Sequence, residues 1–226
     1  MEIKVVENVM KFNDEFAHQN RERLKRAGVA CVDIIGSPGS GKTTLLEVAL
    51  ERLRPGVRVG VIAGDIATTR DAERLAGKCA QVTQINTGGS CHLDANQVRL
   101  GMDELDLGAL DLLIIENVGN LICPVGFDLG QDAKVGLFSV PEGDDKPAKH
   151  PRIVLEADLL VLTKTDLEPY VPFDRAAFER DLRSIRGDAP VLVTSATTGE
   201  GIDAWCEWLR GVAKGRAAPV NAGGAG

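Results

Sequence analysis

The sequence has few aromatic residues and no long apolar run. Aromatic side chains make up 4% of the 226 residues, so aliphatic side chains must fill the core. No apolar run reaches the roughly 18 residues that a membrane-spanning helix needs. The first residues, Met1-Glu2-Ile3-Lys4, also lack the charged and then apolar pattern of a signal peptide. We therefore expect a cytoplasmic protein with no membrane partner.

An excess of positive charge is missing too. Lys and Arg number 26 against 33 Asp and Glu, which gives a formal net charge of −7. A general nucleic-acid binder would carry a basic stripe, so we expect no nucleic acid among the partners. The sequence has three histidines and five cysteines. In a reducing compartment, a cluster of these residues indicates a metal before a disulfide.

Short aliphatic runs alternate with helical patterns along the chain. Most runs are apolar almost throughout, as is typical of strands that helices cover on both faces. The expected strands are 29–35, 57–63, 81–85, 110–115, 134–140, 159–162 and 191–193, and the expected helices are 1–28, 42–53, 68–77, 93–105, 174–186 and 203–213. This alternation predicts an α/β domain with a mostly parallel sheet between two helical layers. The polar, proline-rich residues 141–151 are expected to form a surface loop.

A phosphate-binding motif follows the first expected strand and opens a helix. It consists of Gly36, Ser37, Pro38, Gly39, Ser40, Gly41, Lys42 and Thr43, which fit the P-loop pattern Gly-x-x-x-x-Gly-Lys-(Ser/Thr) in full. Its glycines let backbone N–H groups surround phosphate oxygens, Lys42 supplies a cation to the β- and γ-phosphates, and Thr43 offers a hydroxyl to Mg²⁺. The alternative, a glycine-rich turn without function, is disfavoured by the flanking strand and helix. The fold class is thus a three-layer P-loop NTPase domain.

Two carboxylates follow strands at the same edge of the expected sheet. Asp65 comes after the second strand and Glu116 after the fourth. Thr43 directly, with Asp65 and Glu116 through water, forms a suitable oxygen set for Mg²⁺. Asp65 can also orient the attacking water, and Gly119 is placed to offer its N–H to the γ-phosphate. The alternative is that a carboxylate only caps a following helix.

A Lys-x-Asp motif follows a later strand and predicts the base. The carboxylate of Asp166 can accept from both N–H groups along one edge of guanine, whereas adenine would present a lone pair to it. We therefore expect GTP rather than ATP. The stem of Lys164 can lie over the base, and Ser195 and Ala196 follow the last strand where they can reach the guanine carbonyl.

A second group of residues suits a soft metal ion. Cys91 and His92 follow a glycine-rich turn, and Cys123 lies four residues after Gly119. Two thiolates and an imidazole suit Zn²⁺ in tetrahedral geometry or Ni²⁺ in square-planar geometry. The alternative, that cysteines are small buried hydrophobes, fits Cys31, Cys79 and Cys206 better. The short step from Gly119 to Cys123 predicts that nucleotide state and metal affinity are linked.

These motifs together resemble the HypB family, GTPases that insert nickel during maturation of nickel–iron hydrogenases. The resemblance rests on residues 36–44, 64–74, 86–93, 116–130, 142–151 and 163–167. It implies GTP hydrolysis to GDP with Mg²⁺, a nickel or zinc site at Cys91, His92 and Cys123, and a homodimer promoted by nucleotide and metal. It further implies a small nickel metallochaperone and the hydrogenase large-subunit precursor as partners. Thr44 then joins the nucleotide site, and Lys149 reaches nucleotide across the dimer.

The residue pattern divides the chain into three parts, and the sequence departs from the family at two points. The parts are an N-terminal helix over 1–28 packed on the core, a P-loop GTPase domain over 29–214 and a disordered tail over 215–226. The sequence contains neither the Cys-x-x-Cys-x-Cys motif nor the His-rich tract of some family members. Thr163 stands where many GTPases have an Asn that ties the base-binding segment to the phosphate loop, which predicts modest guanine affinity.

Three other functions compete with this interpretation. A urease-maturation-type nickel GTPase would carry a Cys-Pro-His arrangement, whereas Cys91 and His92 are adjacent here. A nucleotide-gated metal-binding regulator would bind GTP without significant turnover. A P-loop kinase for a small acceptor would need neither the Lys-x-Asp motif nor the Cys-His pair. Arg70 is a candidate for an arginine that reaches the γ-phosphate in the hydrolase.

Overall fold

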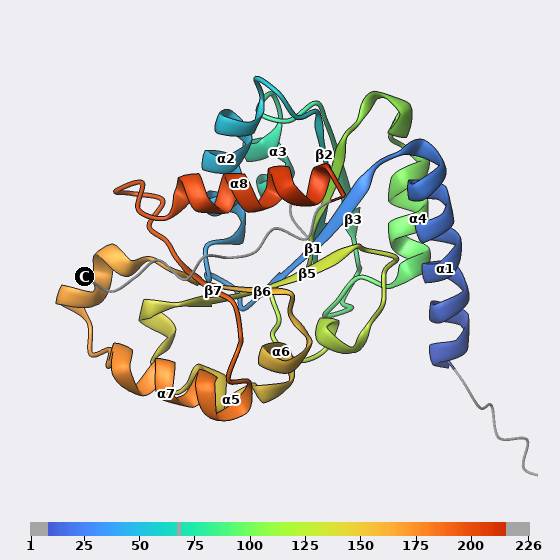
Figure 1. The fold of residues 1–226 in the computed structure, drawn as a ribbon. Coiled ribbons are helices and arrows are strands. Elements are labelled where there is room, and N and C mark those ends of the chain that lie inside the picture. The colour runs from blue at the N-terminus through green and yellow to red at the C-terminus, as the bar shows by residue number, and fades with distance from the viewer. Residues whose placement is uncertain (1–8, 67–68, 216–226) are drawn as a thin grey trace, which may run out of the picture.

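The structure, a computed structural model, describes residues 9–66 and 69–215. Residues 1–8 of the expected N-terminal helix, residues 67 and 68, and residues 216–226 of the expected tail lie outside the described residues. Within the described part, seven parallel strands form one sheet in the order β3-β2-β4-β1-β5-β6-β7 (Figure 1). The expected fold class is confirmed.

Strands and helices alternate along the chain as the hydrophobic pattern predicts. The strands are β1 (Ala30–Gly36), β2 (Val59–Asp65), β3 (Gln81–Asn86), β4 (Leu112–Glu116), β5 (Ala133–Ser139), β6 (Leu159–Thr163) and β7 (Val191–Val193). The α-helices are α1 (Val9–Ala27), α2 (Lys42–Leu53), α3 (Arg70–Leu75), α4 (Ala95–Asp103), α5 (Lys146–Lys149), α6 (Pro151–Glu156), α7 (Arg175–Ile185) and α8 (Ile202–Ala213). Short 3-10 helices lie at Leu107–Ala109, Pro124–Gly126, Val140–Glu142 and Thr165–Tyr170.

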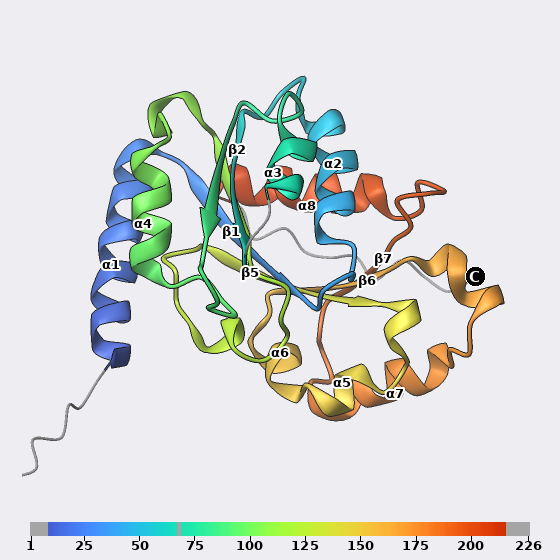
Figure 2. The same ribbon diagram turned by 180° about the vertical axis from the view of Figure 1, so that it is seen from behind.

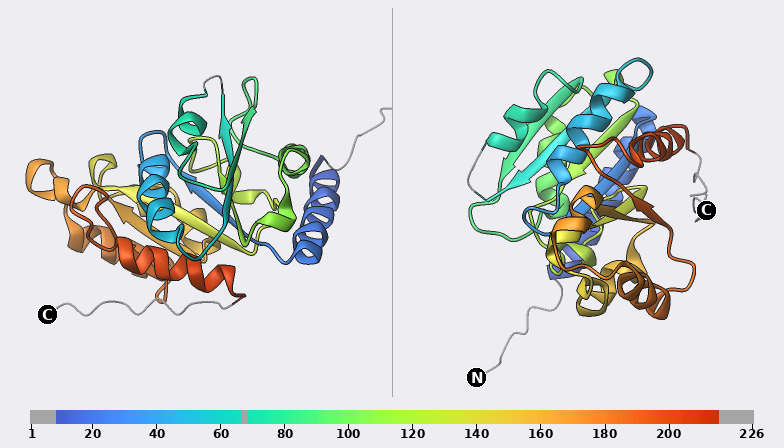
Figure 3. Two further views of the ribbon diagram at one scale, coloured as in Figure 1. Left: turned by 90° about the horizontal axis from the view of Figure 1, so that it is seen from above. Right: turned by 90° about the vertical axis from the view of Figure 1, so that its left-hand side faces the viewer.

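The helices form two layers, one on each face of the sheet. Helices α2, α3 and α8 lie together on one side, and α5, α6 and α7 lie on the other (Figures 1 and 2). Helices α1 and α4 pack against each other beside the β2–β4–β1 part of the sheet. Figure 3 shows that α1 and α7 lie at opposite ends of the molecule.

Alternate residues of the central strands fill the core on the two faces. Val32 and Ile34 of β1 pack with Leu50 of α2 and with α8 on one face. Fully burying an aliphatic side chain of this size stabilises the fold by roughly 1.5–3 kcal/mol. The two tryptophans of the chain, Trp205 and Trp208, both belong to α8 and stack with ring centroids 5.7 Å apart.

Helix α1 is held to the domain by two buried asparagines as well as by apolar contacts. Asn20 donates from Nδ2 to the carbonyls of Ala95 (2.8 Å) and Leu129 (2.9 Å). Asn13 accepts from the N–H of Ala95 at 2.9 Å. Because both asparagines bond to Ala95, the first residue of α4, they link α1 to the start of that helix.

The expected surface loop at 141–151 is wrong in part. The segment contains the 3-10 helix that ends at Glu142 and helix α5, and α6 begins at Pro151. Pro147 is buried. Proline is well tolerated in the first turn of a helix, because the N–H that it lacks has no partner there. The prolines therefore begin short helices in this segment rather than excluding them.

Within residues 9–66 and 69–215, no helix combines the length and the apolar character that crossing a bilayer requires.

A carboxyl group lies in the middle of the sheet. Asp33 of β1 is fully buried and pairs in register with Lys134 of β5. Its Oδ1 accepts from Asn117 Nδ2 at 3.1 Å. Burial raises the pKa of Asp33 from 3.8 to about 7, although the bond from Asn117 and the charge of Lys134 act to lower it. In the folded protein this group therefore keeps its proton over a pH range in which the unfolded chain has lost it.

The raised pKa of Asp33 predicts a pH-dependent stability. Because the folded-state pKa lies above the unfolded one, the contribution of this group falls as pH rises from 3.8 to about 7, by about 1.4 kcal/mol per pH unit. Between about pH 5 and about pH 6.5, the unfolding free energy of the native chain should fall by about 2 kcal/mol more than that of Asp33→Asn. Urea denaturation at the two pH values measures this difference. Equal changes in both proteins would contradict the assignment.

Candidate nucleotide and metal sites

The P-loop runs from the end of β1 to the start of α2. Gly39 and Gly41 have φ angles of 77° and 94°, which glycine adopts without strain. These turns bring the chain around Lys42, which is 8% exposed and donates from Nζ to the carbonyls of Gly36 (3.0 Å) and Ser37 (3.2 Å). Burial lowers the pKa of Lys42, while the nearby carboxyl of Glu116 acts to raise it.

A pocket of about 480 Å³ opens in front of the P-loop. Its lining includes Pro38, Gly39, Gly41, Lys42, Thr43, Thr44, Asp65, Glu116, Gly119 and Lys164. The pocket lies at the carboxyl edge of the sheet because β1, β4 and β2 are parallel neighbours. In the register, Glu116 pairs with Ile34 of β1 and with Ala63 of β2. The structure thus brings together, in one pocket, most of the residues that the sequence predicts for phosphate and Mg²⁺.

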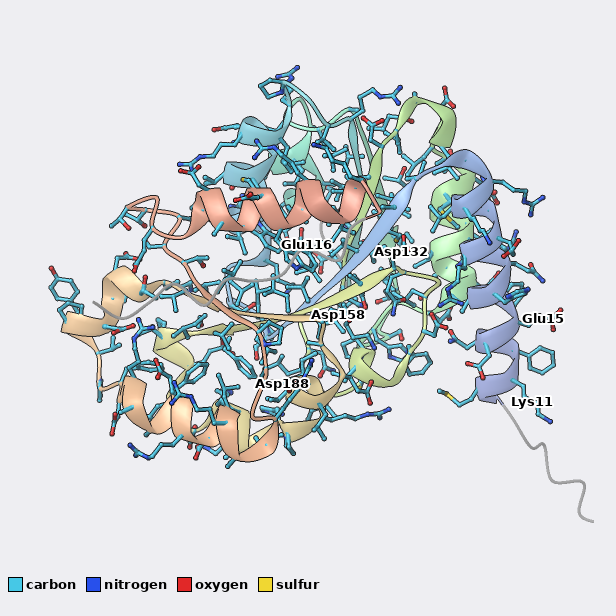
Figure 4. All side chains as sticks on the ribbon, viewed as in Figure 1. Lys11, Glu15, Glu116, Asp132, Asp158 and Asp188 are labelled. Atoms are coloured by element: carbon cyan, nitrogen blue, oxygen red, sulfur yellow. The ribbon has the colours of Figure 1, made fainter. Side chains whose placement is uncertain are left out.

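Glu116 and Thr43 contact each other inside this pocket. Thr43 Oγ1 donates to Glu116 Oε1 at 2.6 Å. Glu116 Oε2 is buried without a hydrogen-bond partner among the described residues, and Figure 4 shows Glu116 near the middle of the molecule. Burial raises the pKa of Glu116 to about 7. A hydroxyl beside a carboxylate with an unused oxygen fits the hard oxygen set that Mg²⁺ prefers.

Asp65 is the last residue of β2 and lines the same pocket. It is not the N-cap of α3, because Thr69 takes that position. Gly119 enters the pocket from the other side, after β4. A Cβ there would lie 3.0 Å from the backbone nitrogen of Pro38, so the absence of a side chain allows this close approach to the P-loop.

A smaller pocket of about 270 Å³ adjoins the P-loop on the side of β6. Lys164, Asp166, Leu167 and Ala196 are among its lining residues. Ser195 is buried behind this lining, and its Oγ donates to Asp166 Oδ1 at 2.6 Å. Lys164 has φ 60°, and its Nζ donates to the carbonyl of Gly39 at 2.6 Å. The proposed base-reading carboxylate is thus held in place by Ser195 at the edge of a pocket.

Thr163 ties the base-binding segment to the phosphate loop. Its Oγ1 donates to the carbonyl of Ser40 at 2.6 Å, and Thr163 is 5% exposed. The hydroxyl therefore provides the connection for which many GTPases use Asn at this place. The modest guanine affinity was predicted because Thr163 was expected not to make this connection. The affinity stays a prediction, but the buried hydrogen bond from Thr163 to Ser40 shows that the connection is made.

The three soft-ligand residues lie close together. Ligand atoms of Cys91, His92 and Cys123 are all within 4.8 Å of one another, and Cys91 Sγ lies 3.7 Å from His92 Nδ1. Burial lowers the pKa of His92, which favours the neutral imidazole that binds metals. His92 packs on Phe127, with ring centroids 4.0 Å apart. We call these three residues the metal clasp.

Local hydrogen bonds hold both loops of the metal clasp. After His92 and Leu93, Asp94 and Gln97 form a reciprocal capping box that begins α4. Cys123 precedes the 3-10 helix that starts at Pro124, and its N–H lies 3.4 Å from Asn120 Oδ1. Cys31 and Cys206 are buried in the core and Cys79 packs beside it, as the sequence predicts.

Comparison with known proteins gives the family. The family model described as CobW/HypB/UreG, nucleotide-binding domain, matches residues 30–193. A probable hydrogenase maturation factor HypB from Methanocaldococcus jannaschii is 42% identical over 207 residues, covering 92% of this chain and 94% of its own. The chain belongs to the HypB family.

Two solved HypB structures share the fold over almost their whole length. HypB from Archaeoglobus fulgidus superposes with a TM-score of 0.84 at 40% identity, covering 90% of this chain and 100% of its own. HypB from Helicobacter pylori, solved in complex with nickel, has a TM-score of 0.86 at 34% identity and covers 93% and 99%. The nickel belongs to that structure.

Two charged residues of this HypB-family chain line the phosphate pocket without having been expected there, beside the uncharged Gly64, Ile66, Asn117 and Val118. The charged residues are Asp71 and Arg74 of α3. Arg74 donates to Thr44 Oγ1 at 3.0 Å and forms an ion pair with Glu47. Arg70, the arginine expected near the γ-phosphate, is exposed and absent from the lining. The Asp-Ala-Glu-Arg stretch at 71–74 could have indicated Arg74, because Arg74 lies one helical turn beyond Arg70 on the same side of α3.

Lys149 lies apart from both pockets within one HypB chain. It stands at the end of α5, with its side chain 62% exposed and paired with Asp145. Neither the phosphate pocket nor the smaller pocket includes it in its lining. A contact with nucleotide would therefore have to be made from a second copy of the chain, and it stays a prediction.

Proposed function

We propose that this protein hydrolyses GTP to GDP and uses that reaction to control nickel, or zinc, at Cys91, His92 and Cys123. The cargo would be nickel for the large-subunit precursor of a nickel–iron hydrogenase. The observation that carries the proposal is that the short segment from Glu116 to Cys123 contacts both sites. It begins at the carboxylate bonded to the P-loop threonine, passes Gly119 against Pro38, and ends at a metal ligand.

The chain's own residues account for the phosphoryl-transfer step. Lys42 is buried beside the pocket and can exchange its two carbonyl acceptors for β- and γ-phosphate oxygens. Thr43 and Glu116 would hold Mg²⁺, which neutralises phosphate charge when bound. Asp65 is placed to orient the attacking water, and Gly119 to donate its N–H to the γ-phosphate. Among the described residues, Arg74 is the arginine that lines this pocket, and its pairing with Glu47 suits a slow switch.

The same proposal assigns assembly and partners. A homodimer promoted by nucleotide and metal would bring Lys149 of one copy to the nucleotide of the other, and a small nickel metallochaperone would exchange metal with the clasp. Helix α1 would act as a helix packed on the GTPase domain of 29–214, and the bonds of Asn20 to Ala95 and Leu129 support this.

One experiment tests the proposed function as a whole. Phosphate release from GTP and ATP, nickel stoichiometry and sedimentation would be measured with GDP and with a non-hydrolysable GTP analogue. We expect GTP turnover, one nickel per clasp, and a dimer that depends on the bound nucleotide. GTP retained without turnover would favour the metal-binding regulator. Nickel affinity that is identical with both nucleotides would remove the switch.

Replacing Asp166 with Asn tests the base assignment. The variant amide presents a donor as well as an acceptor to guanine, so one hydrogen bond to the base is lost. We expect GTP affinity to fall by about 10- to 100-fold, as for a hydrogen bond to a charged group, and XTP to bind better than GTP. Competition binding with both nucleotides measures this. Unchanged preference for GTP would overturn the role of Asp166.

A further inference from the structure

Three hydrogen-bonded links join the P-loop and the phosphate pocket to the two segments that carry the metal clasp. Thr87 N–H donates to the carbonyl of Asp65 at 2.9 Å, and Asn120 N–H donates to the carbonyl of Gly36 at 3.0 Å. Both of these links are made by backbone groups. The third is made by the side chain of Asn117, which is 1% exposed and follows Glu116 directly.

The side chain of Asn117 forms hydrogen bonds both to β1 and to the segment that follows His92. Its Nδ2 donates to Asp33 Oδ1 at 3.1 Å, three residues before the first P-loop glycine. Its Oδ1 accepts from the N–H of Leu93 at 3.1 Å and from the N–H of Val118 at 3.0 Å. Leu93 follows the metal ligand His92, so one amide connects the strand that enters the P-loop, the segment after Glu116 and the clasp.

Leu93 is itself fixed from a second direction. It is fully buried, and a Cβ at Gly64 would lie 2.8 Å from Leu93 Cδ1. Gly64 immediately precedes Asp65 of the phosphate pocket. A movement of the chain at Glu116 would therefore shift Asn117 against a leucine that is packed on Gly64 beside the pocket, and His92 would follow.

We propose that Asn117 is a positioning residue that makes the geometry of Cys91 and His92 depend on the nucleotide bound. The proposal rests on the proposed function, because it assumes that nickel affinity differs between GDP and GTP states. It adds the residue through which that difference is transmitted. Coupling free energies between sites commonly change affinity by about 5- to 150-fold, which sets the expected size.

The test compares nickel dissociation constants measured with GDP and with a non-hydrolysable GTP analogue, in the presence of Mg²⁺. The native chain should show at least a fivefold difference within the usual range of coupling. Asn117→Ala should still bind nickel and nucleotide, but the ratio of its two nickel constants should fall to about half of the native ratio or less, since the Leu93 N–H has lost its acceptor while the two backbone links remain. A native-sized difference in Asn117→Ala overturns the inference.

Two further variants separate transmission from general loosening. In the double swap Asp33→Asn with Asn117→Asp, the new amide can donate to the new carboxylate, which can still accept from Leu93 and Val118, so the nucleotide dependence should return. Asp132→Ala removes a side chain that accepts from the backbone N–H of Cys31 at 2.8 Å, at the end of β1 away from the P-loop, and it should keep the native difference. Loss of the difference in Asp132→Ala as well would overturn the inference.

A separate measurement covers the case in which Asn117→Ala does not fold. Amide hydrogen exchange at Leu93 in the native chain should change when the GTP analogue replaces GDP. An unchanged Leu93 amide, with nickel constants that do differ, overturns the role of Asn117 and leaves the proposed function intact. Identical nickel constants in the native chain instead refute the proposed switch, so the two failures are distinguishable.

Discussion

Replacing Lys42 with alanine is expected to lower GTP hydrolysis by about a thousandfold. The ammonium group is buried at the base of the phosphate pocket, bonded to the carbonyls of Gly36 and Ser37. No water can replace a fixed cation there without a loss of transition-state stabilisation. The variant should stay folded, because α2 packs through Leu45, Leu46 and Leu50. Metal delivery should be lost with hydrolysis.

Lys25→Ala serves as the matched control for this variant. Lys25 is an exposed residue in the last turn of α1. Phosphate release under single-turnover conditions gives the rate, and thermal unfolding verifies the fold of both variants. A Lys42→Ala protein that hydrolyses GTP within tenfold of the native rate would show that catalysis does not depend on this cation.

The double variant Cys91→Ala with Cys123→Ala is expected to weaken nickel binding by at least about a hundredfold. Outer-shell changes alone commonly cost about 10- to 100-fold, and this variant removes two of three candidate ligands that lie within 4.8 Å. The nucleotide pocket should remain, since neither cysteine lines it. Dimerisation promoted by metal should disappear, while any dimer promoted by nucleotide alone should persist.

Cys79→Ala with Cys206→Ala supplies the matched control for cysteine loss. These residues pack in or beside the core formed with α2 and α8. Equilibrium dialysis gives the nickel affinity, thiolate-to-nickel absorption identifies the ligand type, and sedimentation gives the oligomeric state. If the control loses nickel and the clasp variant retains it, the metal site has been assigned to the wrong cysteines.

The sheet and the P-loop were predictable because their signals are local. A strand covered on both faces is apolar at nearly every position, and all of β1, β4 and β6 are buried apart from Ala30. The P-loop needs glycines, Lys42 and Thr43 at fixed spacing between a strand and a helix. The boundaries were less certain: β4 begins at Leu112 rather than residue 110, since Leu110 follows a 3-10 turn.

Features that depend on contacts between distant residues could not be predicted in the same way. Sequence spacing did not distinguish Arg70 from Arg74, because one helical turn separates them and only the packing of α3 on α2 selects which one faces Thr44. The bonds of Asn117 to Asp33 and Leu93 span 84 and 24 residues. The tie from Thr163 to Ser40 spans 123 residues, so its hydroxyl could be recognised only once β6 lay beside the P-loop.

Tryptophan fluorescence reports on only one layer of this protein, because both tryptophans belong to α8. Trp205 and Trp208 belong to the cluster that includes Leu46 and Leu50 of α2, the helix that begins at Lys42. Cys91 and Cys123 precede α4 and a 3-10 helix whose residues pack in other clusters. Fluorescence therefore monitors the layer behind the P-loop, and changes at the thiolates require a different probe.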